Sequence, residues 1–285
     1  TSSVTCIIQI IWDKDDTTFA SGSRDGSIRI WNGECQNVLT GHTASIWSLC
    51  QIGLLLVSGS SEIKVWNLNT LECTHNLTNH IGAIMSMTYF NKTLCTAGED
   101  KTVKLWKDFQ CYNSLTGHTS TILCITGIEW RRLENYILTG SRDETIRLWD
   151  LDKSTCVRVF TGHSDSIRCL LYVKWDRDDF TFLSGSEDNS IKMWNLESGE
   201  CLRVLNEHLS FVNCITQMIW EKDQTTIVSG GYDNNIKMWN IETGECLRTL
   251  KGHKGAVNCL IHMNWVKDQT TLLSGSDDKT IKLWN

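Results

Sequence analysis

A tryptophan that recurs at nearly constant spacing constrains the fold of this 285-residue chain more than any other feature. The first two gaps between consecutive markers are 35 and 40 residues, and the last four are 43, 45, 45 and 45. The markers are Trp31, Trp66, Trp106, Trp149, Trp194, Trp239 and Trp284. A period of roughly 20–50 residues is typical of solenoids and propellers, in which each repeat buries its apolar face against its neighbours.

Three polar residue types follow the same period. Histidines lie 31 residues before the last four markers, and a further histidine lies 24 residues before Trp66 and 26 before Trp106. These histidines are His42, His80, His118, His163, His208 and His253. An aspartate stands six residues before six of the markers: Asp25, Asp100, Asp143, Asp188, Asp233 and Asp278. A serine or threonine stands ten residues before the same markers: Ser21, Thr96, Thr139, Ser184, Ser229 and Ser274.

The segments between these markers have the pattern of short β-strands. In residues 257–262 Val257, Cys259 and Ile261 alternate with three other residues, and turns rich in Gly, Asn and Asp separate such runs. No segment keeps a helical period for three turns. About four strands in each 45-residue repeat are typical of a propeller blade. The sequence therefore predicts an all-β fold, a seven-bladed β-propeller of four-stranded antiparallel blades.

The combination of Gly-His, Ser-Gly-Ser-x-Asp and Trp-Asn or Trp-Asp resembles the WD repeat over the whole chain. In that family Asp, His, Ser or Thr, and Trp of one blade form a buried hydrogen-bonded tetrad. A neutral histidine can pass a hydrogen bond from a carboxylate to a hydroxyl, and the indole N–H completes the chain. The resemblance implies these tetrads: Asp143, His118, Thr139 and Trp149; Asp188, His163, Ser184 and Trp194; Asp233, His208, Ser229 and Trp239; Asp278, His253, Ser274 and Trp284.

The same Asp-His-Ser composition occurs in the catalytic triad of hydrolases. Catalysis needs one exposed nucleophile, whereas this set recurs in several blades at positions expected to be buried. No Cys-x-x-Cys pair supports a structural zinc site. We therefore expect no enzymatic activity, no cofactor and no metal.

Charge and cysteine usage narrow the partners further. The net charge is −6, and lysine and arginine are spread along the chain rather than gathered in a basic stripe, so nucleic acid is not an expected partner. No apolar run approaches the roughly 18 residues of a membrane helix, so no membrane is expected either. The 13 cysteines follow the repeat rather than a disulfide pattern. Free thiols indicate a reducing compartment, and we expect an intracellular, cytoplasmic and monomeric domain.

The ends and the second blade depart from the regular pattern. By alignment the chain starts at the innermost strand of blade one and stops at the third strand of blade seven, so the last blade lacks its outermost strand within this chain. We expect residues 1–285 to form a single domain of a longer protein, with residues upstream of Thr1 supplying that strand. In blade two Ser58 to Glu62 is two residues short and no Asp precedes Trp66. An incomplete tetrad is therefore expected there, and blade two should be the weakest.

A propeller fold does not by itself define a function. The resemblance implies that partners bind around the central channel, through the third and fifth residues after each His and the residue before each Asp. Large apolar groups and arginines at these positions favour a protein or peptide interface. The expected binding residues are Arg24, Trp47, Met85, Leu123, Arg142, Arg168, Phe211 and Tyr232.

Two interpretations of this face remain open. The first is a non-enzymatic scaffold for protein or peptide segments. The second is a phosphopeptide receptor, because Arg142 and Arg168 resemble the arginines with which F-box substrate receptors of ubiquitin ligases hold a phosphorylated peptide. Bidentate arginine suits phosphate. A third arginine of that group would fall at Leu123, and no F-box lies in this chain.

Overall fold

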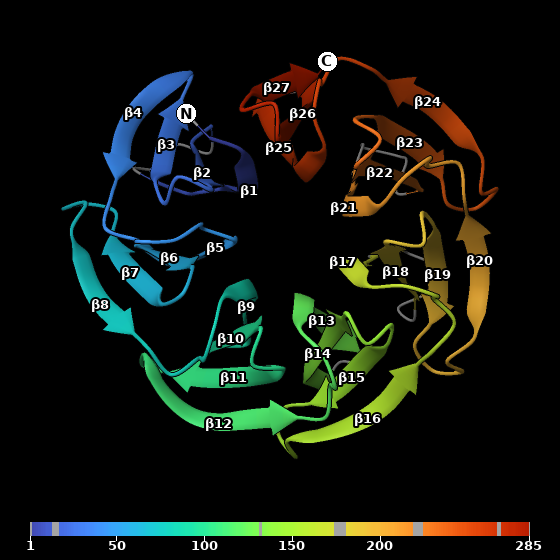
Figure 1. Cartoon of the computed structure of the whole chain (residues 1–285), viewed down its shortest axis with the longest axis horizontal. Helices are drawn as coiled ribbons and strands as arrows, with labels where there is room; N and C mark the ends of the chain where they lie inside the picture. Colours follow the sequence, from blue (N-terminus) through green and yellow to red (C-terminus); the bar gives the residue numbers. More distant parts are fainter. Residues whose placement is uncertain are drawn as a thin grey trace.

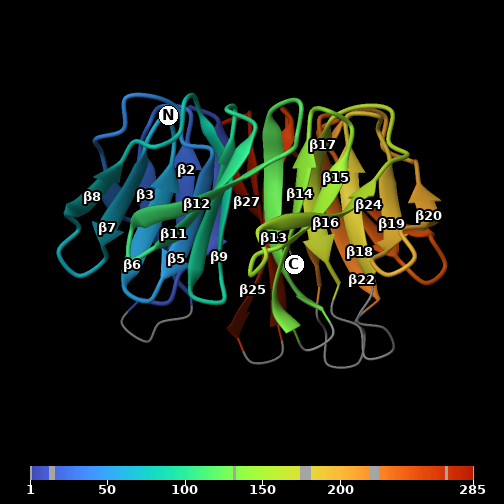
Figure 2. The same cartoon turned by 90° about the horizontal axis from the view of Figure 1, so that it is seen from below.

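The strands form seven antiparallel sheets arranged radially around a central axis (Figure 1). The computed structural model describes residues 2–12, 17–130, 133–173, 181–218, 225–266 and 269–284. Six of the sheets have four strands and the last has three, so the predicted seven-bladed propeller with a shortened final blade is confirmed. Figure 2 shows the ring from the side, with the strands running between its two faces.

Each blade is one sequence-local sheet whose strands follow one another from the channel outward. Blades one to four comprise β1 (Val4–Gln9), β2 (Phe19–Ser23), β3 (Ile28–Asn32) and β4 (Glu34–Leu39); β5 (Ser48–Ile52), β6 (Leu55–Gly59), β7 (Ile63–Asn67) and β8 (Cys73–Leu77); β9 (Ile84–Phe90), β10 (Thr93–Gly98), β11 (Thr102–Lys107) and β12 (Gln110–Thr116); β13 (Ile122–Trp130), β14 (Leu133–Ser141), β15 (Ile146–Asp150) and β16 (Thr155–Phe160). Blades five to seven comprise β17 (Ile167–Tyr172), β18 (Thr181–Ser186), β19 (Ile191–Asn195) and β20 (Cys201–Leu205); β21 (Val212–Gln217), β22 (Thr226–Gly231), β23 (Ile236–Asn240) and β24 (Cys246–Leu250); β25 (Val257–Val266), β26 (Gln269–Ser276) and β27 (Ile281–Trp284).

The strands of a blade differ in burial because blades pack face to face. All six residues of β18 are buried, whereas burial alternates along the outermost strands such as β16. In blade five Leu183 pairs with Leu171 on one side and with Met193 on the other. Strands that are covered on both faces consist of a continuous run of apolar or small residues, whereas strands covered on one face alternate between buried and exposed residues. The pattern therefore accounts for the mixture of runs and alternation in the sequence.

The apolar core lies between neighbouring blades rather than within one blade. Leu183 and Ile191 of blade five share a cluster with Ile227 and Trp239 of blade six. The glycine of the Ser-Gly-Ser motif permits this approach, because a Cβ on Gly185 would lie 2.6 Å from Sγ of Cys169 and 2.7 Å from Cγ1 of Val212. The motif is thus a requirement of blade packing.

The ring closes where blade one meets blade seven (Figure 1). Val4 of β1 packs with Met263 and Leu273, and Nδ2 of Asn258 donates to the carbonyl oxygen of Val4 at 2.9 Å. The expectation that residues upstream of Thr1 supply a fourth strand beside β27 stays a prediction. No helix long and apolar enough to cross a membrane occurs in the part of the chain that the structure describes.

Candidate functional site

Blade five shows the hydrogen-bonded network that the repeated polar residues imply. Nδ1 of His163 lies 2.6 Å from Oδ2 of Asp188, and its Nε2 lies 2.7 Å from Oγ of Ser184. Trp194 donates its indole N–H to the same hydroxyl at 2.8 Å. Because the carboxylate accepts the Nδ1 proton, the serine hydroxyl can donate to Nε2. The chain of bonds connects the surface turn to the core between two blades.

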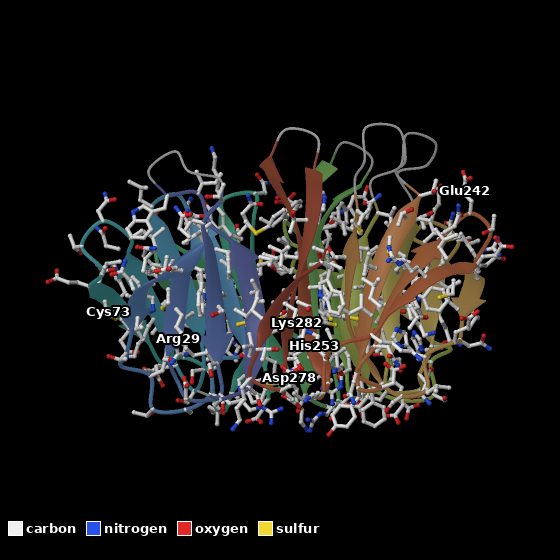
Figure 3. All side chains as sticks on the ribbon, turned by 90° about the horizontal axis from the view of Figure 1, so that it is seen from above. Arg29, Cys73, Glu242, His253, Asp278 and Lys282 are labelled. Carbon is white, nitrogen blue, oxygen red and sulfur yellow. The ribbon has the colours of Figure 1, made fainter. Side chains whose placement is uncertain are left out.

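The same arrangement occurs in blades three, four, six and seven. The histidine Nδ1 lies 2.7–2.9 Å from the carboxylate in these blades. His253 and Asp278 of blade seven are labelled in Figure 3, where Asp278 lies on the face opposite Glu242. The residues are His80, Asp100, Thr96 and Trp106; His118, Asp143, Thr139 and Trp149; His208, Asp233, Ser229 and Trp239; His253, Asp278, Ser274 and Trp284.

The expectation of an incomplete tetrad in blade two is wrong, because the network of that blade is complete. Glu62 takes the place of the missing aspartate, with Oε1 2.8 Å from Nδ1 of His42. Nε2 of His42 lies 2.6 Å from Oγ of Ser58, and Trp66 donates to that hydroxyl at 2.8 Å. Glutamate is one methylene longer than aspartate, so it can reach the histidine from a turn that is two residues shorter.

The serine, tryptophan and aspartate of the repeat are also present in blade one. Trp31 still donates to Oγ of Ser21 at 2.8 Å. Asp25 accepts hydrogen bonds from the backbone N–H and the hydroxyl of Ser27 and lies 3.7 Å from Nη1 of Arg29. Local donors of the same turn therefore bind this carboxylate.

Hydrogen bonds within the networks keep the carboxylates ionised, and burial keeps the hydroxyls away from any ligand. Burial disfavours the charged form of Asp100, but hydrogen bonds from His80 and Thr102 outweigh it and lower the pKa of that carboxyl to about 2. The network hydroxyls, such as those of Ser184 and Ser229, belong to residues with no exposed surface. A substrate cannot contact an oxygen buried in this way, so the geometry gives these groups a structural role.

Seven equivalent positions, one from each blade, surround a cavity of about 150 Å³ at the mouth of the central channel. Six of them are the fifth residue after a network histidine, and Thr5 is the counterpart in blade one. Arg24, in the turn after β2, completes the wall. We call this space the channel-mouth cavity; its lining residues are Thr5, Arg24, Trp47, Met85, Leu123, Arg168, Asn213 and Asn258.

The channel-mouth cavity has an apolar half and a polar half. Trp47, Met85 and Leu123 come from blades two, three and four, which are consecutive around the ring. Blades five, six and seven contribute Arg168, Asn213 and Asn258. A ligand in this cavity would therefore meet aliphatic and aromatic surface on one side and N–H groups on the other.

Both arginines of the cavity are held by ion pairs. Nε and Nη2 of Arg168 lie 2.7 and 2.6 Å from Oε1 of Glu187. Nη2 of Arg24 lies 3.4 Å from Oδ1 of Asp277, across the junction of blades one and seven. The Arg24 guanidinium also lies over the ring of Trp47, 5.8 Å from its centroid. These contacts fix the positions of two long side chains and neutralise their charge.

Three of the expected binding residues lie outside the lining of this cavity. Arg142 is exposed and makes no ion pair with the residues that the structure describes. Phe211 contacts both the Arg168 guanidinium, 5.8 Å from its ring centroid, and Tyr232, 5.6 Å between centroids. Tyr232 is 55% exposed. These two rings form a short apolar surface on blade six beside the cavity.

Three lining residues hold repeat positions that the resemblance places on this face, but they were not among the eight binding residues selected from the sequence. Thr5, Asn213 and Asn258 are small and polar, and neither hydrophobicity nor charge distinguishes them. Their repeat position is the signal that identifies them. Within the described residues no group of three or more His, Cys, Asp or Glu side chains is arranged to hold a metal ion.

The fold and its networks define a class, the seven-bladed propeller built from repeats with a buried polar tetrad. The family model described as "WD domain, G-beta repeat" matches residues 1–32, 33–67, 71–107, 109–150, 154–195, 199–240 and 244–285. The chain therefore belongs to the WD-repeat family. Propeller domains of this family are generally non-catalytic and generally bind proteins or peptides.

A solved structure supports the same assignment. The crystal structure of the WD40 β-propeller domain of Doa1 superposes with a TM-score of 0.85 at 26% sequence identity, covering 100% of this chain and 93% of that chain. No curated protein matches the sequence. The similarity extends over the whole ring rather than one group of blades.

Proposed function

We propose that this propeller is a non-enzymatic scaffold that binds peptide or protein segments on the face around the central channel. The observation that carries the proposal is the channel-mouth cavity, in which the equivalent residues of all seven blades meet. Trp47, Met85 and Leu123 provide apolar contact, and two arginines border it. Buried aromatic and arginine side chains in a pocket are the usual energetic centre of a protein interface.

The two ion pairs strengthen this proposal. Glu187 and Asp277 hold Arg168 and Arg24 in place before any partner binds. A long side chain that is already ordered loses less conformational entropy on binding. The exposed ring of Tyr232 extends the apolar surface from the cavity over blade six, which gives an extended segment a second place to bind.

The test compares the two faces of the ring with a peptide library and the whole chain. Trp47→Ala should weaken the selected peptides about thirtyfold, because truncating a central interface aromatic removes about 2 kcal/mol of binding free energy. Leu54→Ala is the control, since Leu54 is exposed in the β5–β6 turn at the other end of β5 from Trp47. Equal affinity of wild type and Trp47→Ala, with a loss in Leu54→Ala, would place binding on the opposite face.

A phosphopeptide receptor of a ubiquitin ligase is the second candidate. The exposed Arg142, which forms no ion pair with any described residue, favours it. Arg168 is less suited, because Glu187 already accepts a hydrogen bond from its Nε and lies 2.6 Å from its Nη2. Phosphorylated and unphosphorylated libraries should be compared on wild type and on the double variant Arg142→Ala/Arg168→Ala. Phosphate-dependent binding that the double variant loses would support this candidate, and the absence of any phosphate preference would exclude it.

A further inference from the structure

Of the three arginines on the expected binding face, Arg142 alone has no carboxylate partner among the residues that the structure describes. Nη2 of Arg24 lies 3.4 Å from Asp277, and Nη2 of Arg168 lies 2.6 Å from Glu187. The Arg142 side chain is exposed and forms no hydrogen bond or ion pair with any described residue. All five N–H donors of its guanidinium are therefore accessible to a partner.

The repeat places Arg142 at the rim of the channel-mouth cavity, beside Leu123. Its backbone N–H donates to Thr121 at 2.9 Å, and the equivalent residues of blades five to seven make the same bond at 2.8–2.9 Å. In blade five the side chain at this position, Glu187, contacts Arg168, which occupies the repeat position of Leu123. The Arg142 guanidinium can therefore reach the edge of the apolar half of the cavity, where Leu123 offers it no acceptor.

The charges around Arg142 favour a ligand group with a single negative charge. Glu187 of blade five is already paired with Arg168. Glu99 holds the same repeat position in blade three, and its carboxylate accepts the backbone N–H of Ala83 at 3.0 Å within that blade. One guanidinium between these two acidic residues balances one carboxylate, whose two oxygens match its planar fork. A phosphate carries about 1.5–2 negative charges at pH 7 and would be repelled more strongly by both glutamates.

We propose that Arg142 binds the side-chain carboxylate of an aspartate or glutamate in the partner segment. A neighbouring apolar side chain of that segment occupies the apolar half of the channel-mouth cavity, against Trp47, Met85 and Leu123. The partner is thus an acidic, unphosphorylated segment. This inference rests on the proposed function, since it names the chemistry that the same face recognises.

Selection from a peptide library tests the charge on the intact chain. The peptides are unphosphorylated, acetylated at the N-terminus and amidated at the C-terminus, so that only side chains carry charge. Wild type should select Asp or Glu next to a large apolar residue. Arg142→Glu should select Lys or Arg at the same place, because reversing the charge on one side of an interface reverses the charge that complements it.

The affinity of one selected peptide is then compared with that of its amide version, in which Asn or Gln replaces the acidic residue. Wild type should bind the amide version about fivefold more weakly, as expected for an exposed ion pair. Arg142→Gln should bind both versions equally, and Arg142→Lys should retain part of the preference because an ammonium lacks the planar fork. The matched control Arg248→Gln, at an exposed position on the outermost strand β24, should leave both affinities at their wild-type values.

Four outcomes would overturn the inference. They are a selection without acidic residues, an equal loss from amide replacement in wild type and Arg142→Gln, tighter binding of a phosphoserine version that Arg142→Gln loses, or binding that needs a free C-terminal carboxylate. If one of these occurs while Trp47→Ala still weakens peptide binding, the assignment of Arg142 is wrong and the binding face stands. If peptide binding does not depend on Trp47, the proposed function itself fails, whatever the charge preference.

Discussion

Blades two and five build the same network from different carboxylates. Asp188 stands six residues before its tryptophan, and Glu62 stands four before Trp66. Asp188 accepts from His163, from the backbone N–H of Ser164 at 3.2 Å, and from both donors of Ser190 at 2.9 and 2.6 Å. Glu62 accepts from His42 and Ser61 and lies 3.9 Å from Nζ of Lys64.

The difference between the two blades is in what else the carboxylate organises. In blade five the carboxylate joins the turn that contains Ser190 to His163 and to the adjacent Ser164. In blade two it mainly holds His42. The common requirement is therefore the position of one carboxylate oxygen beside Nδ1, and the length of the turn decides whether aspartate or glutamate meets it.

Removing the carboxylate should have the largest effect on stability, and the size of the loss should differ between blades two and five. Asp188→Ala leaves several buried or half-buried donors without an acceptor, and we expect a loss of about 3–4 kcal/mol of unfolding free energy. Glu62→Ala leaves fewer donors unpaired and should cost about 1–2 kcal/mol. Urea unfolding of the two variants measures the difference. Equal losses would mean that the additional bonds of Asp188 contribute nothing.

Changing only the length of the carboxylate sharpens the comparison. Glu62→Asp keeps the charge but withdraws it by one methylene from Nδ1 of His42, so we expect a loss of about 1 kcal/mol. Glu62→Gln keeps the reach and retains an acceptor, and should cost less than Glu62→Asp. Urea unfolding midpoints rank the two. If Glu62→Asp is as stable as wild type, the extra methylene is not what compensates for the short turn.

The sequence predicts the regular parts of this molecule because they repeat. Seven blades and the tetrads of blades four to seven follow from residues at fixed offsets from a marker tryptophan. The tetrad of blade two was predicted wrongly because counting six residues back from Trp66 assumes a turn of constant length. A side chain one methylene longer, from a turn two residues shorter, restores the contact that the count does not find.

The electrostatics of the channel mouth could not be predicted in the same way. Arg24 and Asp277 meet only because ring closure brings blade one beside blade seven. Arg168 and Glu187 belong to one blade, but an offset along the chain does not show that their side chains pair. The number of bonds that an asparagine donates is likewise a property of the packed ring, since Nδ2 of Asn213 donates to Val257, whereas Nδ2 of Asn258, at the same repeat position, donates to both Val4 and Asp277.

Mild acid should destabilise blade two by protonating His42, and the loss of stability should be smaller than the losses caused by the substitutions. Burial lowers the pKa of His42, although Glu62 opposes the shift. The folded state therefore resists protonation, so this contribution to stability is present above about pH 6.5, the unfolded value, and decreases as the pH falls below it. The network carboxyls have lowered pKa values, with Asp100 at about 2, so their contribution is lost only as the pH falls below about 4.

The window between about pH 7.5 and about pH 5.5 therefore isolates the histidines. The urea midpoint of wild type should fall across this window, and the fall should be smaller in His42→Gln, which removes the titrating ring. Some pH dependence should persist, because burial also lowers the pKa of His253 and His262. An unchanged slope in His42→Gln would show that the neutral state of His42 contributes nothing to the difference between blades two and five.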